Sequence, residues 1–228
     1  MMIKQKHQPR DERIGLLGGT FNPIHNGHLK VAELVCRRLE LQKILFIPSY
    51  IPPHKESFDV LPALHRLRMA QLALEPHPAF FPSVVEIESP KTSYSIHTIS
   101  MLKEKYPQAE LFFILGIDAF LEIETWKDYQ KVLDQCSFAV IGRIGYSLQD
   151  AWMAVSPSYA DRIIDLSSAV DGLATHSGPL IYLLDMKTPD ISSTAIRRRI
   201  REELSIEGLV PESVAMYIQT NKLYQEVS

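Results

Sequence analysis

Short runs of consecutive apolar residues alternate along this chain with longer segments of helical periodicity, and this alternation strongly constrains the fold. Apolar residues in unbroken succession suit strands that are buried on both faces, as in a parallel sheet. Regular alternation of such strands with helices is typical of doubly wound α/β domains. The chain therefore predicts a mostly parallel sheet of six strands, at residues 14–17, 44–48, 83–87, 111–116, 138–142 and 180–184.

Helical segments account for much of the remaining chain. After residue 184 no further strand is expected, and two helical segments form a C-terminal extension. We expect one domain over 14–228, with 190–228 as its helical part, after a disordered or expression-related lead-in at 1–13. Residues 147–179 are less patterned and are expected to form surface helix and loop. Helices are predicted at 26–41, 61–75, 95–106, 191–204 and 211–224.

Composition disfavours several classes of function. Lys and Arg number 24 against 27 Asp and Glu, and the resulting net charge of −3 argues against a nucleic-acid-binding surface. No apolar run approaches the roughly 18 residues that a membrane-spanning helix requires, and the polar start lacks a signal peptide's apolar core. Two cysteines, Cys36 and Cys136, are too few for a disulfide scaffold or a zinc site. We expect a cytoplasmic protein without nucleic-acid or membrane partners, either monomeric or homo-oligomeric.

A glycine-rich loop with two histidines, residues 18–28 (GGTFNPIHNGH), follows the first strand. Gly18 and Gly19 allow the backbone to approach a ligand and to adopt positive φ. A helix that begins within the loop presents amides that favour an anion, and His25 and His28 project to one side of it. The combination predicts a phosphate site. The alternatives are a structural turn, or a metal pair for which no third ligand is evident.

A second candidate phosphate site lies at residues 190–200 (DISSTAIRRRI). Ser192 or Ser193 is a favourable N-cap for the helix that follows, and the serine hydroxyls and helix amides could hold phosphate oxygens. Arg197, four residues after Ser193, is expected to face the same anion. The alternative is a capped amphipathic helix with solvated arginines.

Together the two segments resemble the signature of nucleotidyltransferases that carry the H-x-G-H motif. Within that superfamily, GGTF-x-P-x-H-x-G-H is similar to bacterial nicotinate-nucleotide adenylyltransferases, and the resemblance runs from about residue 13 to residue 224. It implies a Rossmann-like nucleotidyltransferase fold. It also implies adenylyl transfer from ATP to nicotinate mononucleotide, giving deamido-NAD and pyrophosphate, with Mg²⁺ carried by ATP and no metal site of the protein's own.

The resemblance assigns roles to individual residues of this sequence. His25, His28 and Arg197 would be catalytic, acting on phosphate oxygens. Asp118 would accept hydrogen bonds from a ribose, and Trp126 would stack on the pyridine ring. The remaining ATP-binding residues would be Gly18, Gly19, Thr20, Phe21, Gly116, Ile191, Ser192 and Ser193. The acceptor nucleotide would also be bound by Lys55, Thr92, Tyr94 and Ser95.

Residue type alone leaves some of these roles open. Trp126 could be a buried structural side chain, Lys55 a solvated one, and residues 91–99 a strand-to-helix capping loop. The sequence departs from the family pattern at His97, where Asp is common, and at Ile144, where Pro is common.

Other functions compete with this assignment. Nicotinamide mononucleotide is an alternative acceptor. Phosphopantetheine adenylyltransferases carry Thr at the position of His25, and cytidylyltransferases are disfavoured on the same grounds. A non-catalytic nucleotide-binding module would not be expected to keep both histidines, Ser193 and Arg197. A fragment of a class I tRNA synthetase would need a lysine-rich loop and a basic surface. The proposed transfer requires no general base, because the attacking phosphate is already anionic at pH 7.

Overall fold

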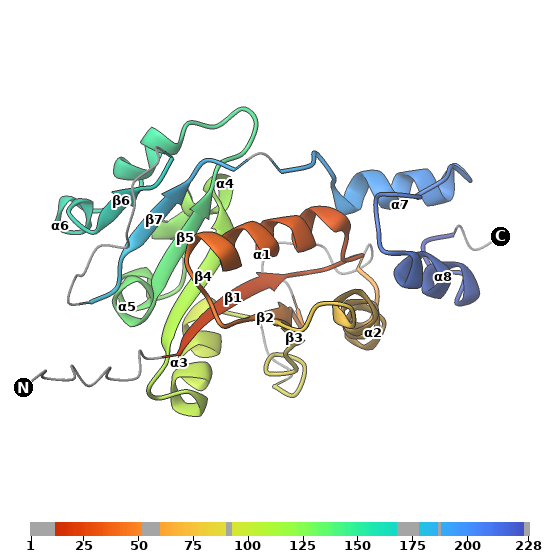
Figure 1. The fold of residues 1–228 in the computed structure, drawn as a ribbon, viewed down its shortest axis with the longest axis horizontal. Coiled ribbons are helices and arrows are strands. Elements are labelled where there is room, and N and C mark those ends of the chain that lie inside the picture. The colour runs from red at the N-terminus through yellow and green to blue at the C-terminus, as the bar shows by residue number, and fades with distance from the viewer. Residues whose placement is uncertain (1–11, 52–59, 90–92, 168–177, 187, 226–228) are drawn as a thin grey trace, which may run out of the picture.

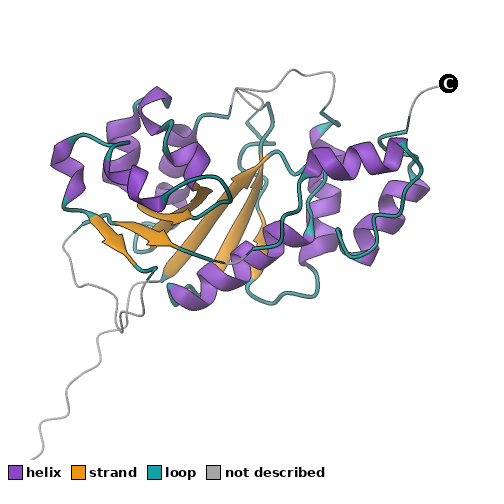
Figure 2. Cartoon of the chain, turned by 90° about the horizontal axis from the view of Figure 1, so that it is seen from above, coloured by secondary structure: helices purple, strands orange, loops and turns teal. Residues whose placement is uncertain are grey.

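The structure, a computed structural model, describes residues 12–51, 60–89, 93–167, 178–186 and 188–225. Seven parallel strands form one sheet in the order β3-β2-β1-β4-β5-β7-β6, with helices on both faces (Figure 1, Figure 2). The predicted α/β class is therefore confirmed. The strands are β1 (Arg13–Gly19), β2 (Lys43–Pro48), β3 (Phe80–Pro82), β4 (Glu110–Gly116), β5 (Ser137–Ile141), β6 (Ile163–Asp165) and β7 (Ile181–Leu184).

The helices divide between two hydrophobic clusters, one on each face of the sheet. Helices α1, α2, α7 and α8 contribute to one cluster, and α3, α4, α5 and α6 contribute to the other. Their bounds are α1 (Asn26–Arg38), α2 (Ala63–Leu74), α3 (Ser95–Lys105), α4 (Ile117–Phe120), α5 (Tyr129–Gln135), α6 (Pro157–Ala160), α7 (Ser193–Arg201) and α8 (Glu212–Thr220), with 3₁₀ helices η2 (Ile123–Thr125) and η3 (Leu148–Trp152).

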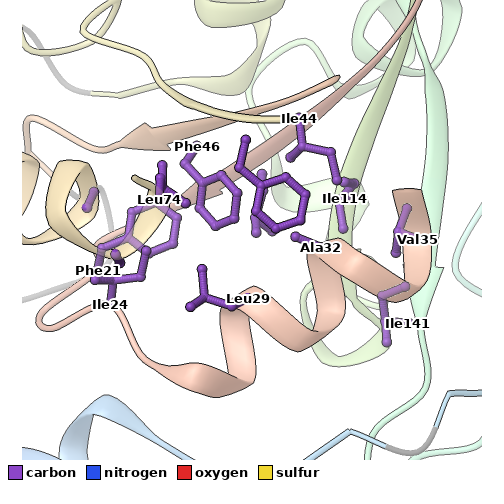
Figure 3. Close-up of a cluster of buried hydrophobic side chains, with 14 of the residues drawn as sticks. Phe21, Ile24, Leu29, Ala32, Val35, Ile44, Phe46, Leu74, Ile114 and Ile141 are labelled. Atoms are coloured by element: carbon purple, nitrogen blue, oxygen red, sulfur yellow. The ribbon is translucent and has the colours of Figure 1, made fainter. Parts of the chain in front are cut away.

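The apolar strands supply side chains to both clusters, as a doubly covered sheet requires. In β1, Leu17 joins the cluster of α1, whereas Ile14 and Leu16 join the cluster of α3. Successive strand residues point to opposite faces, so an unbroken apolar run serves both. Figure 3 shows the α1 side, where Phe21 and Ile24 pack among core residues from the strands and from α2.

The third strand lies earlier in the chain than the sequence predicted. It is β3, at Phe80–Pro82, whereas residues 83–87 form a turn in which the N–H of Glu88 donates to the carbonyl of Val84 at 2.9 Å. The apolar residues of that stretch imitate a strand run. Pro82 cannot donate a ladder hydrogen bond, and it ends the short edge strand.

The seventh strand was missed by the sequence analysis. It is β6, at Ile163–Asp165, within the stretch 147–179 that was expected to form helix and loop. The stretch does contain η3 and α6. Three residues at a sheet edge are too few to produce a recognisable apolar run.

The two C-terminal helices fall in the predicted helical segments, and α8 packs beside α2. The Nδ1 atom of His65 lies 3.0 Å from the hydroxyl of Tyr217, and Ser213 donates to the carbonyl of Leu72 at 3.2 Å. Figure 1 shows α7 and α8 together at one end of the molecule. None of the described helices is long and apolar enough to span a membrane. Residues 1–11 of the predicted lead-in lie outside the described residues.

Candidate active site

A cavity of about 1120 Å³ opens at the carboxyl ends of β1, β4, β5 and β7. Ligands of open parallel α/β sheets bind at this edge, and the volume is sufficient for a nucleotide. The first residues of α1 and α7 also reach the cavity. The predicted site residues that line it are His25, His28, Gly116, Asp118, Ile191, Ser192 and Ser193.

The glycine-rich loop is built differently from the prediction. Gly18 and Gly19 are the last two residues of β1, and the positive φ expected of them falls on Phe21, at 48°. Gly19 leaves room for the Phe21 ring, because a Cβ there would lie only 3.0 Å from it. Gly18, Gly19, Thr20 and Phe21 are not among the described residues that line the cavity. Their role in binding ATP stays a prediction.

The two histidines lie together at the start of α1. Their ring centroids are 3.6 Å apart and the ring planes differ by 24°, so the prediction that they project to one side is confirmed. The backbone N–H of His25 donates to Nδ1 of His28 at 3.2 Å. The ring of Phe21 packs edge-on against His28, with centroids 5.0 Å apart. Because Nδ1 of His28 accepts a hydrogen bond, its neutral imidazole carries the proton on Nε2.

His25 is neutral in the free protein at pH 7. The residue is 6% exposed. Burial lowers its pKa from 6.5 to about 4, and the positive charge of Arg143 adds to the effect. A neutral imidazole has one N–H donor. Any hydrogen bond that His25 donates to a ligand therefore comes from that single N–H.

The low pKa of His25 predicts a loss of stability in acid. Below pH 6.5 the unfolded chain binds a proton that the folded chain refuses until about pH 4, so the free energy of unfolding falls across this window. We expect a loss of about 2 kcal/mol between pH 7 and pH 5, measured by urea denaturation. His25→Gln should flatten this part of the profile, whereas His77→Gln should preserve it. An unchanged acid profile in His25→Gln would contradict the assignment.

The start of α7 brings two serines to the cavity. Ser192 is the N-cap, as predicted, and its Oγ accepts a hydrogen bond from the N–H of Ala195 at 3.2 Å. Ser193 donates from Oγ to the carbonyl of Pro23 at 2.9 Å. Ser193 thus ties α7 to the histidine-bearing loop, and both serines also face the space where a phosphate is expected.

Arg197 has a structural role that the sequence did not predict. It is 8% exposed and donates from Nη1 to the carbonyl of Asn22 at 3.0 Å. It is not among the described residues that line the cavity. Arg197 therefore helps to hold the loop that carries the histidines, and its contact with the triphosphate stays a prediction.

Arg66 of α2, which was not among the predicted site residues, is only 1% exposed. Its guanidinium donates to the carbonyl oxygens of Leu61 at 2.8 Å, Thr20 at 2.7 Å and Tyr50 at 3.1 Å. One side chain thus joins the glycine-rich loop to the segment after β2. The available signal was an arginine at an otherwise apolar position of the predicted helix 61–75.

The C-terminal part of the chain also reaches back to this loop. The hydroxyl of Tyr224 donates to Oδ1 of Asn22 at 2.9 Å, and Asn26 donates from Nδ2 to the carbonyl of Gly208 at 2.8 Å. These contacts span most of the sequence. The histidine loop therefore takes its shape from α2, α7 and the C-terminal segment together.

A charged pair crosses the end of β4. Nε of Arg143 lies 3.1 Å from Oδ1 of Asp118, and both residues line the cavity. Gly116 leaves room for the pair, because a Cβ there would meet Asp118 and would lie 2.5 Å from Nε of Arg143. Arg143 was not among the predicted site residues, although it directly precedes Ile144, where the sequence departs from the family pattern. Ile144, the departure from the family's Pro, is 84% exposed and lines the cavity.

Two of the residues predicted to bind the acceptor, Lys55 and Thr92, lie outside the described residues. Tyr94 is the N-cap residue of α3 and Ser95 is its first residue. Neither is among the described residues that line the cavity. Their role stays a prediction.

Trp126 is half-buried and is not among the described residues that line the cavity. Its ring packs edge-on against Phe113 with centroids 5.7 Å apart, which is a structural contact that leaves part of the indole exposed. Nζ of the next residue, Lys127, lies 4.9 Å from the ring centroid of Tyr94 and 3.3 Å from Nε2 of His97. The fold therefore brings Trp126 and Tyr94 into one neighbourhood, although they come from different segments.

Comparison with known proteins agrees with this architecture. The family model described as cytidylyltransferase-like matches residues 16–199, which include both histidines and the start of α7. The chain therefore belongs to the cytidylyltransferase-like family.

Within that family the chain groups with the nicotinate-nucleotide adenylyltransferases. A relative from Geotalea daltonii, named probable nicotinate-nucleotide adenylyltransferase, is 40% identical and covers 94% of this chain and 99% of its own length. A relative of the same name from Geobacter sulfurreducens is 41% identical, with 93% and 98% covered.

Solved structures share the fold. The Plasmodium falciparum nicotinic acid mononucleotide adenylyltransferase complexed with NaAD superposes with a TM-score of 0.72 at 18% identity, over 93% of this chain and 97% of that one. A structure described as a putative nicotinate-nucleotide adenylyltransferase from Vibrio parahaemolyticus gives a TM-score of 0.63 at 16% identity, with 95% and 97% covered.

Proposed function

We propose that this protein transfers the adenylyl group of ATP to nicotinate mononucleotide, giving deamido-NAD and pyrophosphate in NAD biosynthesis. The observation that carries the proposal is that His25 and His28, at the start of α1, face one cavity with Ser192 and Ser193, at the start of α7. Two helix starts with hydrogen-bond donors at one cavity suit a polyphosphate. The names of relatives with about 40% identity support the same acceptor.

The reaction needs positioning and charge stabilisation rather than proton transfer. A phosphate oxygen of nicotinate mononucleotide attacks the α-phosphorus of ATP, the bond to the bridging oxygen breaks, and pyrophosphate leaves. The attacking oxygen is already anionic, so no base is required. His25 and His28 would each donate one hydrogen bond to oxygens that gain charge in the transition state. The α7 amides and serines would hold the phosphates that leave.

The remaining roles follow from position. Asp118, at the carboxyl end of the sheet, would accept hydrogen bonds from the ribose of ATP. The exposed part of Trp126 would stack on the pyridine ring, with Tyr94 beside it. These assignments rest on geometry and on the motifs, and each is open to substitution.

Mg²⁺ would enter with ATP as part of the substrate. Magnesium takes oxygen ligands and keeps several waters, so the triphosphate is its natural carrier. Among the described residues, no group of three or more His, Cys, Asp or Glu side chains is arranged to hold a metal ion. The chemistry that Mg²⁺ supplies is neutralisation of phosphate charge.

We also propose a cytoplasmic location. Cys36 and Cys136 are both free thiols, as a reducing compartment allows. Burial raises the pKa of both thiols, that of Cys136 to about 12, so both are poorly reactive at neutral pH.

A coupled assay for pyrophosphate release tests the function. Purified protein, MgATP and one acceptor are combined, with nicotinate mononucleotide, nicotinamide mononucleotide and phosphopantetheine compared at equal concentration. We expect the highest kcat/KM with nicotinate mononucleotide. Preference for phosphopantetheine would overturn the assigned acceptor. Binding of ATP without release in any of the three reactions would favour a nucleotide-binding module.

A further inference from the structure

The cavity carries an unusual balance of charge for a site that receives a triphosphate. Among the described residues that line it, Arg143 is the one with a permanent positive charge, and Asp118, Asp185 and Asp190 are acidic. His25 is neutral for the reasons given above, and Arg197 lies outside the lining. Arg143 is therefore the described lining residue whose charge could stabilise a polyphosphate.

Arg143 is placed to reach a ligand. It lies two residues after the end of β5, and its side chain is 61% exposed, so the guanidinium is only partly engaged by its contact with Asp118. The carboxylate partner is itself 36% exposed. An ion pair with this much exposure contributes little stability and can be exchanged for another partner at small cost.

Arg143 also acts on the same space as the catalytic histidines. Its positive charge helps to lower the pKa of His25, because it disfavours the protonated imidazolium. The pair with Asp118 passes over Gly116, and this is the carboxyl end of β4 where a nucleoside is expected. The guanidinium thus lies beside the expected ribose position, in the same cavity as the two histidines.

We propose that Arg143 is a further ATP-binding residue, which exchanges Asp118 for the β- and γ-phosphates when ATP binds. In the free protein Asp118 holds the guanidinium. In the complex the ribose hydroxyls occupy Asp118, and the guanidinium binds the phosphates that depart as pyrophosphate. The proposal rests on the proposed adenylyl transfer.

Pyrophosphate itself is the sharpest probe, because it contains the departing phosphates and no ribose. We expect Arg143→Ala to raise the KM for pyrophosphate in the reverse reaction, and the Kd of MgATP, by about tenfold to a hundredfold, as for loss of a charged hydrogen bond. The KM for deamido-NAD, which lacks the departing phosphates, should not rise, because loss of Arg143 frees Asp118 for the ribose. Arg143→Lys should recover part of the loss. The control is Arg198→Ala on α7, which removes the same charge from an exposed residue outside the lining.

The variant Asp118→Asn distinguishes an exchange of partners by Arg143 from a simple effect of the positive charge of Arg143. If the carboxylate holds Arg143 back, this variant should bind pyrophosphate several-fold more tightly, although it binds MgATP more weakly. Unchanged binding of pyrophosphate in Asp118→Asn, or in Arg143→Ala, overturns the inference and leaves the transfer function intact. The opposite result is also informative. If the wild-type protein binds MgATP, Arg143→Ala loses that binding, and the wild type adenylylates none of the acceptors, the proposed function is overturned and the binding role of Arg143 is supported.

Discussion

Replacing His28 by alanine is expected to lower kcat by about 10²–10³-fold, as is usual when one preorganised donor to a developing charge is lost. Its Nδ1 accepts a hydrogen bond from the N–H of His25, and its ring makes an edge contact with that of Phe21. Nε2–H is thereby oriented without further cost at the moment of reaction. His25→Ala should have a loss of the same order, because the two rings stack on one side of the helix start. Single-turnover measurements with saturating MgATP and nicotinate mononucleotide isolate the chemical step.

A folded control is needed for the histidine variants, because His25 also contributes to the start of α1. His77→Ala removes a partly exposed imidazole that stacks on Phe80, outside the described cavity lining. It should leave kcat within twofold, the range of an ordinary surface change. If soluble, folded His25→Ala and His28→Ala turned over at rates near that of His77→Ala, the assignment of the histidines would be wrong.

Replacing Arg66 by methionine is expected to lower the free energy of unfolding by about 3–6 kcal/mol, a large share of a domain's stability. The substitution fills a similar volume but leaves three partly buried carbonyls, of Leu61, Thr20 and Tyr50, without their donor. An unsatisfied buried acceptor costs about 1–3 kcal/mol, and these three fall in the lower part of that range because their residues are only partly buried. Lysine keeps the charge yet lacks the planar fork that reaches three acceptors, so Arg66→Lys should restore only part of the loss. Urea denaturation at pH 7 measures the change.

The matched control lies two residues away on the same helix. Arg68 is exposed and donates a hydrogen bond to the side chain of Gln71 at 3.3 Å, so Arg68→Met should cost less than about 0.5 kcal/mol. Similar midpoints of urea denaturation for Arg66→Met and Arg68→Met would contradict the inferred structural role of Arg66.

In the folded fraction, Arg66→Met should also show a lower kcat. Thr20 leads into the histidine loop, and a displacement of about 1 Å at the site can lower the rate about 10²-fold.

The local patterns of the sequence were reliable where one segment carries the whole signal. The unbroken apolar run at residues 111–116 became β4, and the N-cap at Ser192 was found in place. The spacing of His25 and His28 predicted correctly that they lie on one side of the helix start, although it did not predict that their rings stack. The stretch 83–87 failed because apolar residues in a turn imitate a strand, and β6 was missed because three residues carry too little pattern.

By itself the sequence determined the parallel α/β class, the loop with its two histidines, and the second motif at α7, because periodicity, capping and glycine placement act over a few residues. Only the tertiary structure decided what holds that loop. Arg66, Arg197 and Tyr224 reach it from positions 46, 175 and 202 residues away from their partners. The same holds for the pairing of Arg143 with Asp118, which joins the ends of β4 and β5. Such contacts depend on which strands are neighbours in the sheet and on which side chains lose water, and neither is encoded in a local spacing.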